Sequence, residues 1–338
     1  MRPTRRDFLQ LSASGLSAAI AGPALALPAS GVADASRRRY QFVQIDVFSA
    51  TRLQGNPLAV FPDARGLSDA EMQGIARETH LQETTFVFPR EPGVEREQGV
   101  KVRIFTPDEE IPFGGHPTLG TAMVLRNRML PESGVAESIR DITLDLKVGK
   151  IPVTFTVDAS GKTFGEMHQV DPVFGAVHER ETVASIVGVK ATDITDEYPI
   201  QNVSTGLLYA IVPLRELRTL HSLRPDNQRI LEYFERRKED AVFYYVTRDT
   251  HDPAVGLRSR GLFPGAEDPA TGSAAGCTAA WMVRYGIAKS AATVRIDQGV
   301  EINRPSQIFV RAERRGDKVL NVRVGGHAIE ISEGHLFL

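Results

Sequence analysis

Short runs in which apolar and polar residues alternate fill most of the chain beyond residue 40, and turn residues end each run. Such alternation is typical of strands that are buried on one face. In the first half of the chain it predicts strands at Tyr40 to Phe48, Leu58 to Phe61, Glu83 to Phe88 and Val100 to Ile104, then a hairpin of residues 141–146 and 150–157 that turns near Val148-Gly149.

Helices are fewer than strands in this pattern. Ser68-Asp69-Ala70-Glu71 is a capping box, which predicts a helix that ends near His80 and buries Met72, Ile75 and Ala76 on one face. In the second half we expect helices at residues 181–187 and 226–237, and strands at residues 164–170, 207–212, 240–247, 293–297, 307–312, 319–324 and 328–331.

Two loops of small residues each lead into a helix. The first runs from Glu110 to Thr118, with Pro117 suited to the first position of a helix over residues 117–127. The second runs from Glu267 to Gly276, with Thr271-Gly272-Ser273 as a cap before the small apolar run from Ala274 to Met282. A helix N-terminus can hold an anion through its unpaired N–H groups and its dipole. Many capped helices bind nothing, so the pattern alone indicates only a candidate site.

The two loops form part of an internal repeat. Glu110 and Glu267 lie 157 positions apart, as do Gly115 and Gly272. Carried backwards, the same spacing aligns Arg103 with Arg260 and Phe86 with Phe243, besides other identities. We interpret this as two homologous halves that each contribute one helix N-terminus to a shared site.

The predicted fold class is α+β, since strands outnumber helices and each half has one central helix of small residues. We expect a sheet wrapped around that helix in each of two lobes, rather than a doubly wound parallel sheet. The lobes are predicted at residues 40–159 and 160–326, with Ala159-Ser160-Gly161 at the boundary. The last segment, residues 327–338, is predicted to be a terminal strand that returns to the first lobe.

The composition is that of an ordinary globular protein with room for two full cores. Of 338 residues 42% are hydrophobic and 24% are charged, and the formal net charge is −2. This balance, without aromatic-basic clusters, gives no reason to expect a nucleic-acid partner.

The first 35 residues have a different pattern. Arg5-Arg6 precedes a charge-free stretch from Phe8 to Ala33, with small residues at positions 24, 26, 33 and 35. This resembles a twin-arginine export signal, which predicts a periplasmic or secreted protein. The alternative is a disordered or membrane-anchoring N-terminus. Pro23 and Pro28 argue against a spanning helix, so we expect no stable membrane insertion once the signal is removed.

The usual strong motifs are missing. The sequence has no dinucleotide-binding GxGxxG after a strand, no GxxxxGK[ST] and no GxSxG. Its eight histidines are scattered without zinc-binding spacing. We therefore expect neither cofactor nor metal. Cys277 is the only cysteine and lies within the predicted second helix, where a buried structural thiol is favoured over a nucleophile.

Several polar residues near the two loops are candidates for chemistry, each with a plainer alternative. Glu83 begins an apolar strand, where burial could raise its pKa and make it a proton shuttle, although a solvated strand end is the commoner role. His116 could bind an anion or cap its helix at the surface. Asp268 could act as a second acid–base group or a cap, and Ser273 as a ligand-binding residue or a cap. Asn56, in a Gly-Asn-Pro turn, could offer its amide to a ligand.

These segments together resemble the PhzF family of phenazine-biosynthesis-like isomerases, which has the diaminopimelate-epimerase fold. The resemblance rests on Asp46-Val47-Phe48 with Gly55 to Val60, Glu83-Thr84-Thr85-Phe86, Gly114 to Thr118, Glu267 to Ala274, and Gln298-Gly299 with Arg304-Pro305-Ser306. It runs in the family's order from about residue 40 to residue 338. One departure is Asn303, which stands before Arg304-Pro305 where the family pattern has glycine.

The resemblance implies roles for the candidate residues. Glu83 would be the catalytic acid–base group, supported by His116, Asp268 and Ser273. Gly115 and Gly272 would present N–H groups to a substrate carboxylate. It further implies catalysis without a cofactor, and a homodimer. Related amino-acid epimerases use a cysteine on each loop, and these loops have none, so a two-thiol reaction is not expected.

The leading hypothesis is therefore a cofactor-independent isomerase or epimerase that moves a proton on a small carboxylate-bearing substrate. The export signal indicates a substrate other than a cytoplasmic phenazine precursor. The alternative is an exported small-molecule binding protein that keeps the cleft without catalysis. A hydrolase that uses Ser273 is less favoured, because the sequence shows no base paired with that serine.

Overall fold

The two halves of the chain repeat the same order of elements at a constant spacing of 157 positions, and this confirms the predicted repeat. The matching elements are β3 (Thr84–Phe88) with β12 (Ala241–Thr247), β4 (Val100–Phe105) with β13 (Leu257–Phe263), and α4 (Gly115–Met129) with α8 (Gly272–Arg284). The computed structural model that shows this describes residues 37–129 and 141–338. The predicted export signal lies outside the described residues.

In the first half, strands pair in the order β18, β1, β2, β3, β4, β6, β7, β8. The β2–β3 and β4–β6 pairs are parallel and the others are antiparallel. The remaining elements of this half are β1 (Arg39–Val47), β2 (Asn56–Phe61), α2 (Asp69–Thr79), α3 (Pro92–Gln98), β5 (Glu110–Ile111), β6 (Asp141–Leu146), β7 (Gly149–Val157) and β8 (Thr163–His168).

The second half has the same order of pairing, from β9 through β10, β11, β12, β13, β15 and β16 to β17. Its parallel pairs, β11–β12 and β13–β15, correspond to those of the first half. The remaining elements are β9 (Val173–His178), α5 (Arg180–Val187), η1 (Ala191–Asp193), β10 (Ile200–Ser204), β11 (Leu208–Leu214), α6 (Leu217–Ser222), α7 (Asn227–Arg237), β14 (Ala266–Asp268), β15 (Val294–Gln298), η2 (Val300–Ile302), β16 (Ser306–Arg315), β17 (Lys318–Gly326) and β18 (Ala328–Phe337).

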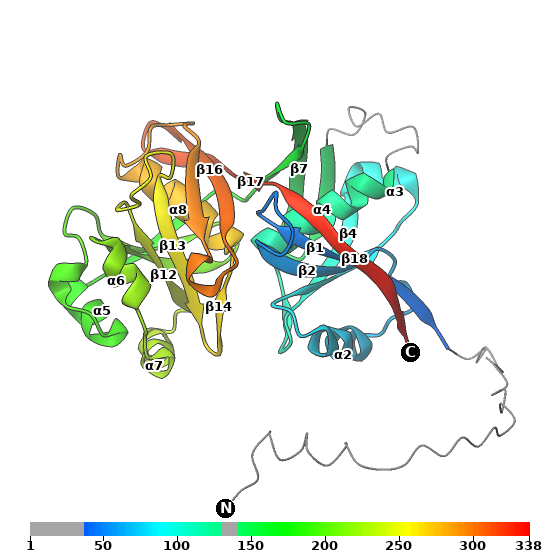
Figure 1. The fold of residues 1–338 in the computed structure, drawn as a ribbon, viewed down its shortest axis with the longest axis horizontal. Helices are drawn as coiled ribbons and strands as arrows, with labels where there is room; N and C mark the ends of the chain where they lie inside the picture. The colour runs from blue at the N-terminus through cyan, green and yellow to red at the C-terminus, as the bar shows by residue number, and fades with distance from the viewer. Residues whose placement is uncertain (1–36, 130–140) are drawn as a thin grey trace, which may run out of the picture. The chain divides into compact units, whose positions relative to one another are not determined.

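Two strands link the halves. The terminal strand β18 lies antiparallel along β1 in the first half, with Phe337 opposite Arg39 and Ala328 opposite Val47 (Figure 1). Strand β8 pairs with β7 on one side and with β17 on the other. Residues 159–161, predicted as a domain boundary, form the turn between β7 and β8, so the sheet continues through this position.

Each half is built around one buried helix. Helix α4 is buried from Gly115 to Arg126 and packs against β1, β2, β6 and β8. Helix α8 is buried from Gly272 to Val283 and packs against β10, β11, β16 and β17. A helix that is buried all round has no polar face, and small residues let the strands approach it closely. The predicted α+β class, with a sheet around a central helix in each half, is confirmed.

The sequence pattern missed α3, α6, β9, β10 and β13, and it took the short strands β5 and β14 as part of the two loops. The omission of β13 has a clear physical reason, because this strand contains Arg258, Ser259 and Arg260, which are polar yet buried. Arg258 and Arg260 are compensated by ion pairs with Glu301 and Glu267. Their partners are remote in the sequence or lie beyond a turn, so periodicity alone gave no strand at residues 257–263. Among the described residues, no helix is both long and apolar enough to cross a membrane.

Candidate active site

The N-termini of the two central helices meet. A β-carbon added to Gly115 would lie 2.4 Å from the Gly272 carbonyl carbon and 2.4 Å from the Ser273 nitrogen, so only glycine fits. A cleft of about 660 Å³ lies at this meeting point. Its lining includes six of the seven predicted site residues, namely Glu83, Gly115, His116, Asp268, Gly272 and Ser273.

Glu83 lies immediately before β3 and directs its carboxyl toward the start of α4. Its Oε2 atom is 3.3 Å from Nε2 of His116, and the Glu83 side chain is 18% exposed. Neither of these two buried atoms makes an aligned hydrogen bond within the described part of the chain. Glu83 is therefore not a solvated strand end, and it presents an unsatisfied oxygen beside the cleft.

Burial determines the charge of this pair. It raises the pKa of Glu83 well above its ordinary value, and the nearby Asp268 carboxylate raises that pKa further. Burial also lowers the pKa of His116 to about 3, so the imidazole is neutral around pH 7. The contact is thus between a neutral histidine and a carboxyl that holds its proton unusually strongly, rather than a conventional ion pair.

Asn56 joins the two halves of the site from beneath. Its side-chain nitrogen lies 2.6 Å from Asp268 Oδ1, 3.1 Å from the Ala270 carbonyl oxygen and 3.0 Å from His116 Nδ1. Two of these partners can only accept, which identifies the Asn56 atom as the amide nitrogen. His116 Nδ1 is therefore the acceptor, and its proton is on Nε2, the nitrogen that faces Glu83.

This geometry differs from the predicted role of Asn56, which was to offer its amide to a ligand. Asn56 is fully buried, and its amide nitrogen is already bound to groups of the protein. Likewise, both ring nitrogens of His116 face protein groups, where an anion contact was one expectation. Asn56 therefore supports the site from behind the cleft surface, whereas His116 lines the cleft with both ring nitrogens turned to protein groups.

Asp268 is the second buried carboxyl of the cleft. Its pKa is raised to about 6 by burial, although hydrogen bonds from Thr271, Ala270 and Asn56 oppose the shift. Because Asp268 has these donors and Glu83 has none, Asp268 ionises first, and its charge then holds the proton on Glu83. Thr271 stands at the N-cap position of α8, as predicted, but its hydroxyl makes no capping bond to the helix and donates instead to Asp268 Oδ2 at 2.7 Å.

Three further polar residues hold this arrangement. The Ser273 hydroxyl bonds to the Tyr209 hydroxyl at 2.8 Å, and both groups are buried. Gln298 donates to the Asp268 carbonyl at 2.7 Å and accepts from the Thr271 amide at 3.1 Å. Nothing in the sequence singled out Tyr209, which stands in an apolar strand, whereas Gln298 belonged to the segments that carry the family resemblance.

The loop beyond Gln298 accounts for the departure at Asn303. That residue has φ of 58°, in the left-handed region that glycine favours and asparagine tolerates. The turn directs Arg304 to Asp46 Oδ1 at 2.6 Å and to the Gly55 carbonyl at 2.8 Å. Arg304 thus fixes the Gly-Asn-Pro turn that carries Asn56.

Cys277 is buried a little more than one turn inside α8. Burial raises the pKa of its thiol to about 12, so it stays protonated and is not an activated nucleophile, as the sequence indicated. Within the described residues, no group of three or more His, Cys, Asp and Glu side chains is arranged to hold a metal ion.

Comparison with known proteins agrees with this geometry. The family model described as phenazine biosynthesis-like protein, PhzC-PhzF, matches residues 45–334. Trans-2,3-dihydro-3-hydroxyanthranilate isomerase of Pseudomonas aeruginosa is 34% identical over 304 residues, which cover 88% of this chain and 100% of that protein. An uncharacterized isomerase of Mesorhizobium japonicum is 34% identical over 307 residues, covering 88% of this chain and 98% of the relative.

The fold agrees as well. A PhzF-family phenazine biosynthesis protein of Bacillus anthracis, solved by crystallography, superposes with a TM-score of 0.77 at 27% identity, covering 89% of this chain and all of that one. Family model, relatives and fold all extend over nearly the whole of the described chain. The chain belongs to the PhzC-PhzF family of phenazine biosynthesis-like proteins and is an isomerase.

Proposed function

We propose that this isomerase moves a proton on a small carboxylate-bearing substrate, and that Glu83 takes and returns that proton. The observation that carries the proposal is the contact between Glu83 Oε2 and neutral His116, 3.3 Å apart in a cleft where burial raises the pKa of Glu83. A general acid–base group works best when its pKa is near the working pH, and burial moves a glutamate in that direction.

In the proposed reaction, ionised Glu83 removes a proton from a carbon beside an electron-withdrawing group of the substrate. The electron pair of the broken C–H bond passes into the adjacent unsaturated system. Protonated Glu83 then gives the proton to another carbon, or to the same carbon, and becomes ionised again. No oxidant or reductant is required, because the product is an isomer of the substrate. His116 Nε2–H, which is 3.3 Å from Glu83 Oε2, would donate to the Glu83 carboxylate once the two groups align, while that carboxylate is charged.

The two helix N-termini are suited to the substrate carboxylate. The first N–H groups of α4 and α8, near Gly115 and Gly272, have no acceptor within their own helices. Both sets face the same cleft, and both helix dipoles place partial positive charge there. The Ser273 hydroxyl, which Tyr209 orients, adds a further polar contact.

Exchange of substrate protons with heavy water tests the proposal. Small cyclic and amino-acid-like carboxylates, including trans-2,3-dihydro-3-hydroxyanthranilate because a relative is named for it, would be screened by NMR. We expect exchange at one or two carbons. In Glu83→Gln the exchange rate should fall by about 10²–10⁴-fold, the usual contribution of a general acid–base group.

The matched control is Glu235→Gln, which removes an exposed glutamate from α7 and should leave the exchange rate unchanged. Full exchange in a folded Glu83→Gln protein would disprove the role of Glu83. Tight binding without exchange in the wild-type protein would favour a binding function instead.

A further inference from the structure

Gln298, at the end of β15, is a fully buried amide that contacts two residues of the cleft wall, Asp268 and Thr271. Its Nε2 atom lies 2.7 Å from the Asp268 carbonyl oxygen and 2.9 Å from the Thr271 hydroxyl. Its Oε1 atom accepts from the Thr271 amide at 3.1 Å and from the Tyr244 hydroxyl at 2.7 Å. A backbone carbonyl only accepts and a backbone N–H only donates, so these contacts settle which end of the Gln298 amide carries the nitrogen.

The orientation of this amide determines the direction of the Thr271 hydroxyl bond. The two hydrogens on Gln298 Nε2 are directed to the Asp268 carbonyl and to Thr271 Oγ1. Because Thr271 Oγ1 accepts one of them, its own single hydrogen is left to point to Asp268 Oδ2, which is 2.7 Å away. A proton on Asp268 Oδ2 would deprive that hydroxyl hydrogen of its acceptor, so this arrangement favours the charged form of Asp268.

The neighbouring strand leaves room for this contact by means of a glycine. A β-carbon on Gly261, in β13, would lie 2.5 Å from Thr271 Oγ1 and 3.2 Å from Gln298 Nε2. The backbone of β13 thus packs directly against the pair, and Asp268 and Thr271 are buried as well. Protein groups rather than bulk water therefore set the direction of the hydroxyl bond.

Five titratable groups surround Asp268, namely Glu83, Glu267, His116, Tyr209 and Tyr244. Burial lowers the pKa of His116 and raises the pKa of both phenols, so these three groups are neutral around pH 7. Glu267 is held by its ion pair with Arg260. The group that competes with Asp268 for a proton is therefore Glu83.

We propose that Gln298 is a positioning residue of this isomerase: it fixes the Thr271 hydroxyl as a donor to Asp268 and so assigns the proton of the two buried carboxyls to Glu83. Gln298 does not line the cleft and acts through the hydrogen of the Thr271 hydroxyl. Without the Gln298 amide, that hydroxyl is free to turn, and Asp268 takes up part of the proton. The consequence for the reaction rests on the proposed function of Glu83, whereas the consequence for the titration of Asp268 does not.

Carbon NMR of the full chain, labelled at its aspartate and glutamate carboxyls, tests the proposal without a substrate. In Gln298→Met the pKa of Asp268 should rise by about one unit, because the charged form loses one directed donor. Thr271→Val, which removes the hydroxyl at nearly constant size, should raise it by the same amount. Thr271→Ser, which keeps the hydroxyl, should retain the wild-type pKa. If Gln298→Met does not fold, equal Asp268 pKa values in the Thr271 variants overturn the proposal.

The double variant Gln298→Met/Thr271→Val separates an effect through the hydroxyl from an independent one. Once the hydroxyl is absent, the loss of Gln298 has nothing further to act on, so the shift should remain about one unit. Shifts that add to about two units would show that Gln298 acts on Asp268 by another route, and the proposal would be wrong.

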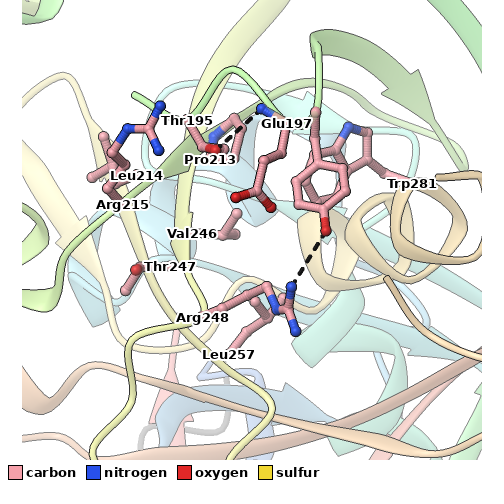
Figure 2. A pocket seen from close by; sticks show the side chains of 11 residues that line it. Thr195, Glu197, Pro213, Leu214, Arg215, Val246, Thr247, Arg248, Leu257 and Trp281 are labelled. Carbon is pink, nitrogen blue, oxygen red and sulfur yellow. Dashed lines mark hydrogen bonds between the residues drawn. The ribbon is translucent and has the colours of Figure 1, made fainter. Parts of the chain in front are cut away.

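Two matched controls make the same chemical changes elsewhere. Gln201→Met removes a buried glutamine of β10, whose amide bonds to the Gly175 carbonyl and the Tyr285 hydroxyl. Thr195→Val alters a threonine that lines a separate, smaller cavity (Figure 2), which shares no lining residue with the cleft. Both should leave the pKa of Asp268 unchanged. A rise in Gln201→Met as large as that in Gln298→Met would mean that any lost buried amide has this effect, which overturns the proposal.

The rate of substrate proton exchange gives the second measurement. Gln298→Met should lower kcat about tenfold with little change in KM, because Asp268 then holds part of the proton that Glu83 returns to the substrate. An unshifted titration of Asp268 overturns the inference whatever the rate. A shifted titration in a protein that exchanges no substrate proton would count against the proposed function and leave the role of Gln298 in the titration standing.

Discussion

Gly115 and Gly272, which stand at equivalent places in the two halves, lie against one another. A β-carbon on Gly115 would come within 2.4 Å of the Gly272 carbonyl carbon, and one on Gly272 would come within 3.2 Å of the Gly115 α-carbon. The repeat thus brings its two helix N-termini so close that neither loop has room for a side chain at this point. That closeness allows both sets of N–H groups to face one small ligand.

Replacing Gly115 by a larger residue should destabilise the folded protein. Gly115→Ala forces the added carbon against backbone, which cannot rotate away, so we expect a loss of about 2–3 kcal/mol in the free energy of unfolding. Gly74→Ala is the control, because Gly74 lies within α2 with nothing near its missing β-carbon. It should gain about 0.5–1 kcal/mol from helix propensity. Urea unfolding measures both, and equal stabilities for the two variants would contradict the close approach.

The constant spacing of 157 made the two-lobed fold predictable, because each loop supported the interpretation of the other. The structure extends the repeat to elements that periodicity missed. Strand β13 matches β4 in position and pairing, yet its buried arginines break the apolar alternation by which a strand is recognised. A buried charge can be recognised only through its partner, and Glu301 lies 43 positions beyond Arg258.

Within the site, the loop residues were predictable and the supporting bonds were not. Gly115, His116, Asp268 and Gly272 stand in recognisable helix-entry segments. That Asn56 bonds to Asp268 across 212 positions is a tertiary contact with no local signal. The family resemblance located Asn56 near the site, while its inward orientation depends on packing that only the fold provides.

Glu83 should make the folded protein less stable as the pH rises above the unfolded pKa of this glutamate. Burial raises the pKa of Glu83 in the folded protein above its value in the unfolded chain. The contribution of Glu83 to the free energy of unfolding is therefore fully present below the unfolded pKa and is lost as the pH rises through the folded pKa. Each unit of difference between the folded and the unfolded pKa of Glu83 changes the free energy of unfolding by about 1.4 kcal/mol. Glu83→Gln cannot ionise, so its stability relative to wild type should rise between about pH 5 and about pH 8. Urea unfolding at both pH values measures this, and a constant difference would contradict burial of the charge.

Asn56→Ala should change the titration of Asp268. The lost amide bond is one that lowers the pKa of Asp268, so that pKa should rise above its present value of about 6. His116 loses the donor to Nδ1 and with it the bond that keeps the proton on Nε2. We expect kcat to fall about tenfold or more with little change in KM. Carbon NMR of the Asp268 carboxyl gives the pKa. Asn127→Ala, at an exposed position of α4, should alter neither value.

We propose that the first 35 residues direct export through the twin-arginine route, on the evidence of Arg5-Arg6 and the charge-free stretch after them. Replacing Arg5 and Arg6 together by lysine keeps the charge and removes the arginine pair. The variant should accumulate in the cytoplasm, as cell fractionation would show. Unchanged export would remove the twin-arginine assignment. Lysine in place of Arg37 and Arg38, beyond the stretch, is the matched control.

The two equivalent arginines should differ in importance. Arg103 and Arg260 each hold the glutamate of their loop, Glu110 or Glu267, through two bonds of 2.8 and 2.7 Å. However, the Arg260 side chain is 3% exposed and that of Arg103 is 21% exposed. Arg260 also donates to three backbone carbonyls at the end of α6, whereas Arg103 donates to the exposed Asp69 instead.

Lysine cannot reproduce a two-bond contact with a carboxylate. Each arginine-to-lysine change therefore removes the same kind of arginine–glutamate contact, from a buried place at Arg260 and from a more exposed place at Arg103. Arg260→Lys should lower the free energy of unfolding by about 3 kcal/mol, because Glu267 and three carbonyls lose donors in a buried place. Arg103→Lys should lower it by about 1 kcal/mol or less, since water reaches that pair. Urea unfolding of the two variants decides the matter. Equal losses would mean that the loops are held by the ion pair alone, irrespective of burial.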